Sequence, residues 1–238
     1  MTIEILEDET TIMVPDNMEY STDGKTWIEI AINETTPEFS EGEYVAFKSI
    51  DYVCSIFKGG IPTSFVINKP YSLRGNCMSL VYGDNAKGQT ALTQPGQFAA
   101  LFAGPALAAE LGIPIDAASV VDIDPGFLPA TELTESCYYL MFGMNALMTS
   151  APVLPAYTLV PECYSMMFMM CSSLNYVKML AVEYTEEAGT FGSTALSSWL
   201  AMTAESGTFV KHEDNNWIEG LDQWDSVPAG WDIETATE

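Results

Sequence analysis

The sequence predicts an α/β fold: a short repeat solenoid with one helix and one strand in each 26-residue repeat, preceded by a small all-β module and closed by a C-terminal cap. Two observations support this prediction. Residues 128–154 and 154–180 are two copies of one unit, and in each copy an apolar spacing of four gives way to alternation. A fixed period of this length indicates units that bury their apolar faces against one another. We place the module at residues 1–75, the solenoid at 76–182 and the cap at 183–238.

The N-terminal residues lack the repeat and are typical of β-strands. An Asp-Gly pair at Asp23 and Gly24 separates two extended runs between Tyr20 and Trp27, and apolar residues alternate beyond it, which predicts a hairpin. Two further strands are predicted at Tyr44–Phe47 and Ser64–Ile67, set apart by Gly and Pro residues that include Gly59 and Gly60.

The pattern changes near residue 76. Cys77–Tyr82 is an apolar run with the character of a strand, and Ser119–Ile123 is a β-branched run that predicts another strand. Between them, Phe98–Leu111 resembles a degenerate helix of the later repeats. Its Leu101 and Phe102 precede Leu107 with the spacing that the first clear copy shows between Met141, Phe142 and Leu147.

The two clear copies have identical residues at eight equivalent offsets. The first copy has Leu128, Pro129, Ala130, Leu133, Cys137, Tyr138, Met141 and Phe142, and the second has Leu154, Pro155, Ala156, Leu159, Cys163, Tyr164, Met167 and Phe168. Apolar residues at i, i+4 and i+8, such as Leu133, Cys137 and Met141, predict one face of a helix. The alternation over Leu174–Leu180 predicts the strand that follows.

The residues after about 181 are expected to close the last repeat. We predict a short helix at Leu196–Met202 and a strand at Gly207–Val210. A solenoid end must cover its last apolar layer, and Trp217, Trp224 and Trp231 can supply that cover.

The five cysteines do not form a disulfide framework, because their number is odd. Cys137 and Cys163 occupy equivalent repeat positions among apolar neighbours, which favours buried free thiols. Stacked repeats would also bring these two residues close enough to bond, so a disulfide stays an alternative.

The chain is strongly acidic, with a formal net charge of −25. Nucleic acid and anionic membrane surfaces are therefore not expected as partners, because binding phosphates requires clustered cations. No apolar run reaches the roughly 18 residues of a membrane helix, so membrane insertion is not expected either. Residues 1–17 show no basic and apolar leader segment of the kind that directs secretion.

The repeat unit resembles the BspA-like leucine-rich repeats of gut-bacterial surface proteins and of phages that infect such bacteria. The residues that carry the resemblance are the Leu-Pro-Ala opening, the Cys-Tyr and Met-Phe pairs, and the run Cys171–Leu174. The hairpin at residues 20–27 is similar to one that often precedes those repeats, and residues 207–211 and 228–231 are similar to their cap. The resemblance implies a non-catalytic role in recognition or adhesion outside the cell.

Few residues suggest chemistry, and we predict no catalytic, cofactor-binding or metal-binding residues. His212 is the only histidine and lies in a polar stretch. Asp122–Gly126 starts like a calcium loop, but Leu133 stands where such a loop needs a glutamate. The Met166–Met170 run coincides with repeat positions, which indicates core packing. A carbohydrate-active enzyme that uses paired acids is the alternative from another class.

The expected function is therefore recognition through an exposed surface. Candidate binding residues are Tyr157, Asn175, Tyr176 and Lys178, because tyrosine and asparagine combine contact area with hydrogen bonding. The expected partner is a protein or a glycan on a cell surface, or another virion protein. Two extracellular-facing locations fit this expectation. One is a virion, as a fibre, tail or capsid-decorating protein, which the missing leader slightly favours, and the other is a bacterial cell surface, as an adhesin.

Overall fold

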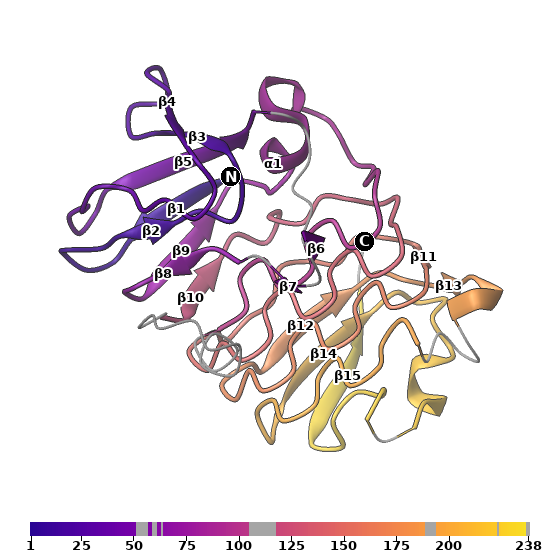
Figure 1. The fold of residues 1–238 in the computed structure, drawn as a ribbon. Helices are drawn as coiled ribbons and strands as arrows, with labels where there is room; N and C mark the ends of the chain where they lie inside the picture. The colour runs from indigo at the N-terminus through magenta and orange to yellow at the C-terminus, as the bar shows by residue number, and fades with distance from the viewer. Residues whose placement is uncertain are drawn as a thin grey trace.

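A six-stranded sheet forms the N-terminal end of the molecule (Figure 1). The computed structural model describes residues 1–50, 57–58, 61–62, 64–104, 118–188, 194–222 and 224–236. In spatial order, the sheet contains β10 (Val120–Ile123), β9 (Tyr71–Arg74), β1 (Thr2–Ile5), β5 (Tyr44–Ser49), β3 (Met18–Ser21) and β4 (Ile28–Ile30). All pairings are antiparallel except that of β10 with β9.

The other strands in the described part of the chain form four smaller sheets. Two are antiparallel pairs: β2 (Ile12–Met13) with β8 (Val66–Ile67), and β6 (Phe57–Lys58) with β7 (Ile61–Pro62). The parallel ones are β11 (Thr158–Leu159) with β13 (Glu183–Tyr184), and the sheet β12 (Tyr176–Met179), β14 (Gly207–Lys211) and β15 (Trp231–Thr235). The helical elements of the described residues are α1 (Ser79–Tyr82) and the 3-10 turns η1 (Gly83–Asn85), η2 (Glu186–Ala188) and η4 (Ile218–Gly220).

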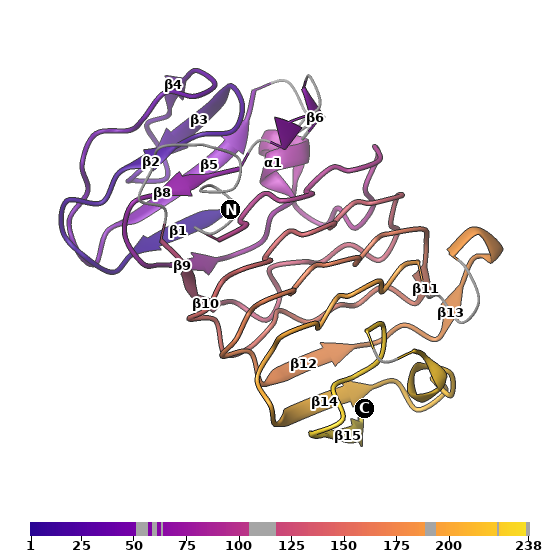
Figure 2. The same cartoon turned by 60° about the horizontal axis from the view of Figure 1, so that its bottom comes forward.

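Four segments made of consecutive turns lie side by side beyond this sheet (Figure 2). We call residues 96–104, 134–144, 160–171 and 194–202 the turn layers A, B, C and D. Within layer B, the amides of Cys137, Tyr139 and Met141 donate to the carbonyl three residues earlier. The amides between them donate to the next layer, as Tyr138 does to the carbonyl of Cys163 at 3.0 Å.

The predicted helix-plus-strand solenoid is wrong, because the segments expected to be helices are not helical. In layers B and C, every fourth residue has a positive φ, for example Leu140 at 54° and Met166 at 53°. A right-handed helix cannot contain such residues. The helix predicted at Leu196–Met202 is also absent, with Ser198 at 53°. The only α-helix among the described residues is α1, which lies where a strand was predicted at Cys77–Tyr82.

The apolar spacing of four explains the error. A chain of four-residue turns returns its side chains to the same face every four residues, and over nine residues this spacing is indistinguishable from the 3.6 of a helix. Half of the amides then bond to the neighbouring layer instead of closing an intrahelical ladder. Left-handed backbone at a non-glycine residue costs about 1–2 kcal/mol, and the hydrogen bonds between layers offset this cost.

Stacked aromatic rings run through the core from the sheet into the layers. Phe65, Phe102, Phe142 and Phe168 stack in sequence, with ring centroids 5.3, 6.0 and 5.8 Å apart. A parallel column contains Phe98, Tyr138 and Tyr164, at 5.9 Å for each pair. These residues belong to one continuous set of buried side chains that also includes Ile3 and Phe47 of the six-stranded sheet.

Several sequence predictions of strands are confirmed. The hairpin around Asp23 exists as β3 paired with β4, and Gly24 takes a φ of 68° in its turn. The strands predicted at residues 44–47, 119–123, 174–180 and 207–210 correspond to β5, β10, β12 and β14, and that at 64–67 survives as the two residues of β8. Gly59 and Gly60, with Leu107, lie outside the described residues.

The cysteines in the described part of the chain form no disulfide. Cys77, Cys137, Cys163 and Cys171 are all buried thiols. Burial raises the pKa of Cys163 to about 12 and does the same for Cys171. The prediction of unbonded Cys137 and Cys163 is therefore confirmed, and the alternative of a disulfide between them is wrong.

Candidate functional site

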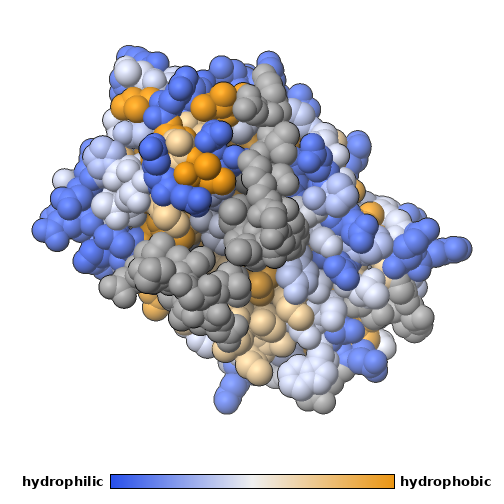
Figure 3. All heavy atoms as spheres, viewed as in Figure 1, coloured by the Kyte–Doolittle hydropathy of each residue, from blue (hydrophilic) through white to orange (hydrophobic). Residues whose placement is uncertain are grey.

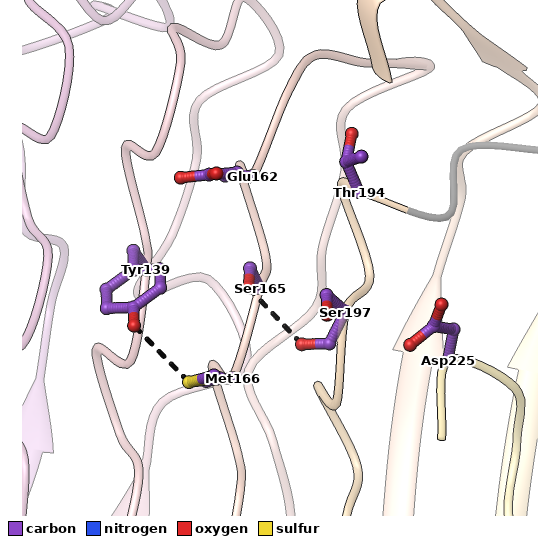
Figure 4. Close-up of a pocket in the computed structure, with 7 residues that line it drawn as sticks. All are labelled: Tyr139, Glu162, Ser165, Met166, Thr194, Ser197 and Asp225. Carbon is purple, nitrogen blue, oxygen red and sulfur yellow. Dashed lines mark hydrogen bonds between the residues drawn. The ribbon is translucent and has the colours of Figure 1, made fainter. Parts of the chain in front are cut away.

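A polar groove of about 380 Å³ follows the turn layers, and we call it the turn-side groove. Figure 4 shows the side chains that line it. They are Tyr139, Glu162, Ser165, Met166, Thr194, Ser197 and Asp225.

The register of the turn layers builds this groove from equivalent positions. The hydrogen bonds between layers place Tyr138, Tyr164 and Leu196 at the same point of layers B, C and D. The next residue of each layer, Tyr139, Ser165 and Ser197, therefore forms one row across three layers. Adjacent hydrogen-bonded segments lie roughly 5 Å apart, so the row presents a polar group at regular intervals.

A second row and a flanking loop complete the lining. Glu162 and Thr194 occupy equivalent positions two residues before Tyr164 and Leu196, and Asp225 joins them from the C-terminal region. The amide of Ser198 donates to Asp225 Oδ1 at 3.1 Å, and Trp199 Nε1 donates to the Asp225 carbonyl at 3.0 Å. These two bonds hold the Asp225 segment against layer D.

Internal hydrogen bonds orient the groove side chains. The Tyr139 hydroxyl donates to Met166 Sδ at 3.3 Å, and Ser165 Oγ donates to the Ser197 carbonyl at 3.3 Å, as Figure 4 marks. Ser136 Oγ donates to Glu162 Oε2 at 2.9 Å. The groove therefore offers oriented hydroxyls and two carboxylates as hydrogen-bond acceptors, together with the ring of Tyr139 and the thioether of Met166 as apolar surface.

The candidate binding residues predicted from the sequence lie outside the groove, on and next to strands β11 and β12. We call this region the strand side. Tyr176 and Lys178 lie on β12, where they pair with Thr208 and Val210 of β14, and exposed Asn175 directly precedes them. Tyr176 and Tyr157 are 38% and 46% exposed. Tyr157 packs edge-to-face on His212, with ring centroids 5.9 Å apart. The structure thus places Tyr176 and Lys178 on one strand, with Asn175 directly before it, but does not place these residues in the groove.

Part of the groove carries a signal in the sequence. Tyr139 and Ser165 have the same offset in the two clear copies, so the repeat alone marks them as neighbours. The sequence does not indicate that Thr194 and Ser197 belong to the groove, because layer D follows layer C at an offset of 32 residues instead of 26.

Asp122 and Asp124, in the segment that starts like a calcium loop, form ion pairs with Arg74. Arg74 bonds Glu4 through Nε at 2.7 Å, and its guanidinium also contacts Asp122 at 2.5 Å and Asp124 at 3.4 Å. Asp124 also accepts a bond from the amide of Gly75 at 2.7 Å. Among the described residues, no cluster of three or more His, Cys, Asp or Glu side chains is arranged to hold a metal ion.

On the face of the molecule shown in Figure 3, small groups of hydrophobic side chains lie among hydrophilic ones over the N-terminal sheet. In the described part of the chain, no helix has the length and apolar character needed to cross a membrane.

No protein-family model matches the chain, and comparison with curated proteins and with solved structures gives no significant match.

Proposed function

We propose that this chain is a non-catalytic recognition protein whose turn-side groove binds a neutral glycan. One observation carries the proposal: three turn layers bring Tyr139, Ser165 and Ser197 into a regular row along a polar groove, in which Ser165 is buried and the other two are half-buried. A regular row suits an extended ligand with repeating polar groups, and a sugar chain has that form.

The chemistry of the lining favours a sugar over other polar ligands. Hydroxyls both donate and accept hydrogen bonds, and Glu162 and Asp225 add carboxylates that accept bonds from sugar hydroxyls. The Tyr139 ring gives an apolar surface beside them. The formal net charge of −25 disfavours sulfated or uronic glycans, because the field of the protein repels anions.

Binding without turnover fits the contacts of the two carboxylates. Glu162 accepts a hydrogen bond from Ser136, and Asp225 accepts one from the amide of Ser198. Both acids therefore have roles within the layers. The alternative from another class, a glycosidase that uses this pair, predicts release of reducing sugar from a bound glycan, and the variants Glu162→Gln and Asp225→Asn would abolish that release.

The test is a screen on a neutral glycan array, followed by calorimetry on the best ligand. Tyr139→Ala is expected to weaken binding at least tenfold, about 1.4 kcal/mol, because it removes the aromatic wall of the groove. Tyr157→Ala is the matched control: it removes an exposed tyrosine from the strand side, and affinity should stay unchanged. A loss with Tyr157→Ala and none with Tyr139→Ala would overturn the groove and favour the strand side.

The proposal also covers where the protein acts, for which we keep the two expected locations. A virion component would be found by mass spectrometry in purified particles, and a bacterial surface adhesin would be found in the cell-envelope fraction. The particle is our preferred location, and recovery from the envelope alone would contradict it.

A further inference from the structure

No described strand pairs with the outer side of the β15 backbone. Strand β15 is the outermost strand of the sheet β12-β14-β15, and among the described residues it pairs only with β14. The amide of Ala236 donates to the carbonyl of Lys211 at 2.8 Å. Backbone groups of successive residues in a strand point to opposite sides, so the amides and carbonyls of Ile233 and Thr235 point away from β14.

An apolar row continues onto this open edge. Val177 of β12, Phe209 of β14 and Ile233 of β15 stand in one register row across the sheet. The first two are fully buried, whereas Ile233 is 39% exposed. The buried face of the sheet is thus incompletely covered at its last strand, and a further strand would cover it.

The opposite face of β15 is acidic. Asp232 and Glu234 are exposed and alternate with Ile233 along the strand. A second copy of β15 at this edge would set these carboxylates against identical ones, and like charges opposite each other destabilise a sheet. Charges on an edge strand prevent self-pairing in this way. A strand with Lys or Arg at the facing positions meets no such repulsion.

We propose that β15 is a docking edge for a β-strand of a different protein, which carries basic residues at alternate positions and apolar residues between them. The incoming strand pairs with the outward backbone groups of Ile233 and Thr235. Its basic side chains face Asp232 and Glu234, and its apolar side chains cover Ile233. This mode is strand addition, in which the backbone provides affinity and alternate side chains provide selectivity.

The experiment uses the full chain and a labelled eight-residue peptide of alternating Lys and Val. Fluorescence anisotropy measures its affinity, and amide hydrogen exchange followed by NMR locates it. Binding is expected to slow exchange at Ile233 and Thr235, whose amides point to the open side. A peptide of equal charge with two central prolines should bind at least tenfold more weakly.

Two variants test the edge separately from general charge attraction. Asp232→Lys with Glu234→Lys should weaken binding at least tenfold. Glu38→Lys with Glu41→Lys changes the net charge equally at exposed sites of the N-terminal region, and should change affinity less than twofold. Ile233→Pro removes one outward donor, and proline is tolerated on edge strands, so it should also weaken binding tenfold in a protein that remains folded by circular dichroism.

Equal losses in both lysine pairs, or no change in exchange at Ile233 and Thr235, would overturn the docking edge and leave only nonspecific attraction. Self-association of the unmodified chain in light scattering would also contradict it, because the edge would then accept its own copy. None of these three outcomes bears on glycan binding, since the turn-side groove shares no residue with β15.

Discussion

Two buried tyrosine hydroxyls have no hydrogen-bond partner among the described residues, which makes them unfavourable polar groups of the core. Tyr164 and Tyr138 are fully buried, and within the described part of the chain neither hydroxyl has an acceptor or donor. Burial raises the pKa of both phenols well above the usual value. An unpaired buried polar group costs about 1–3 kcal/mol.

Replacing the first of these tyrosines by phenylalanine is therefore expected to stabilise the protein. Tyr164→Phe keeps the ring stack with Tyr138 and should raise the free energy of unfolding by about 1 kcal/mol in urea denaturation. Tyr82→Phe is the matched control, because the Tyr82 hydroxyl donates to the Ala91 carbonyl at 2.8 Å. That control should lose about 1 kcal/mol. Equal losses in the two variants would show that the Tyr164 hydroxyl has a partner.

Individual residues of the candidate site differ in how well the sequence predicts them. Tyr139 and Ser165 follow from the repeat, since equal offsets place them side by side. The sequence favoured Tyr157 and Tyr176 because tyrosines suit recognition, and both are exposed, but exposure alone does not create a hollow. The groove depends on the flanking Asp225, which lies far from the repeat in sequence.

Among the elements, the hairpin of β3 and β4 contains a carboxylate with a strongly perturbed pKa. Hydrogen bonds from the amides of Thr26 and Lys25 lower the pKa of Asp23 to about 2. The unfolded value is close to 3.9, so the folded state binds the proton more weakly. The stability from this charge is present above about pH 4, and it is lost as the pH falls through 2.

Asp23→Asn tests the direction of this pH dependence of stability, because asparagine keeps an oxygen acceptor and removes the charge. The variant should melt at a lower temperature than the unmodified protein between pH 5 and 7, and the difference should disappear near pH 2. Thermal melts followed by circular dichroism at several pH values give this difference. Glu38→Gln, at an exposed position, should show no comparable trend. A difference that is the same at all pH values would contradict the role of the charge.

The turn layers allow a second prediction at this scale. Met202 has a φ of 60° and is 63% exposed, so it carries left-handed strain with little burial. Glycine adopts this backbone without the side-chain clash, so the substitution removes a cost of about 1–2 kcal/mol. It also adds a cost of about 0.5–1 kcal/mol, because glycine loses more backbone entropy on folding. Met202→Gly should therefore stabilise the protein by roughly 0.5–1 kcal/mol in urea denaturation. Met202→Val, with a branched side chain, should destabilise it.

These layers also show how far the sequence defines the fold. The strands β5, β10, β12 and β14 follow from β-branched runs and turn residues, which act locally. The layers do not follow, because left-handed residues such as Leu140 and Met166 have no local signal: neither is a glycine or an asparagine. Hydrogen bonds to the neighbouring layer select this backbone, and a single segment does not contain that information.

At the scale of the whole molecule, the aromatic column links regions that the sequence assigned to separate units. Phe65 lies within the predicted module at residues 1–75, whereas Phe102 and Phe142 lie in the predicted solenoid. Phe65 also contacts Phe47 of β5, with ring centroids 5.3 Å apart. Strand β10 joins the six-stranded sheet from beyond residue 75 as well. We therefore expect the sheet and the turn layers to unfold together.

Phe102→Ala tests this coupling, because its ring stacks on Phe65 and on Phe142. Loss of a buried phenylalanine costs about 3–5 kcal/mol, and this cost should appear at both ends of the column. In native-state hydrogen exchange with added denaturant, the slowest amides of β1 and of layer C should show the same decrease in opening free energy. A decrease in layer C with β1 unaffected would mean that the N-terminal sheet is an independent folding unit, whose packing against the layers contributes little to its stability.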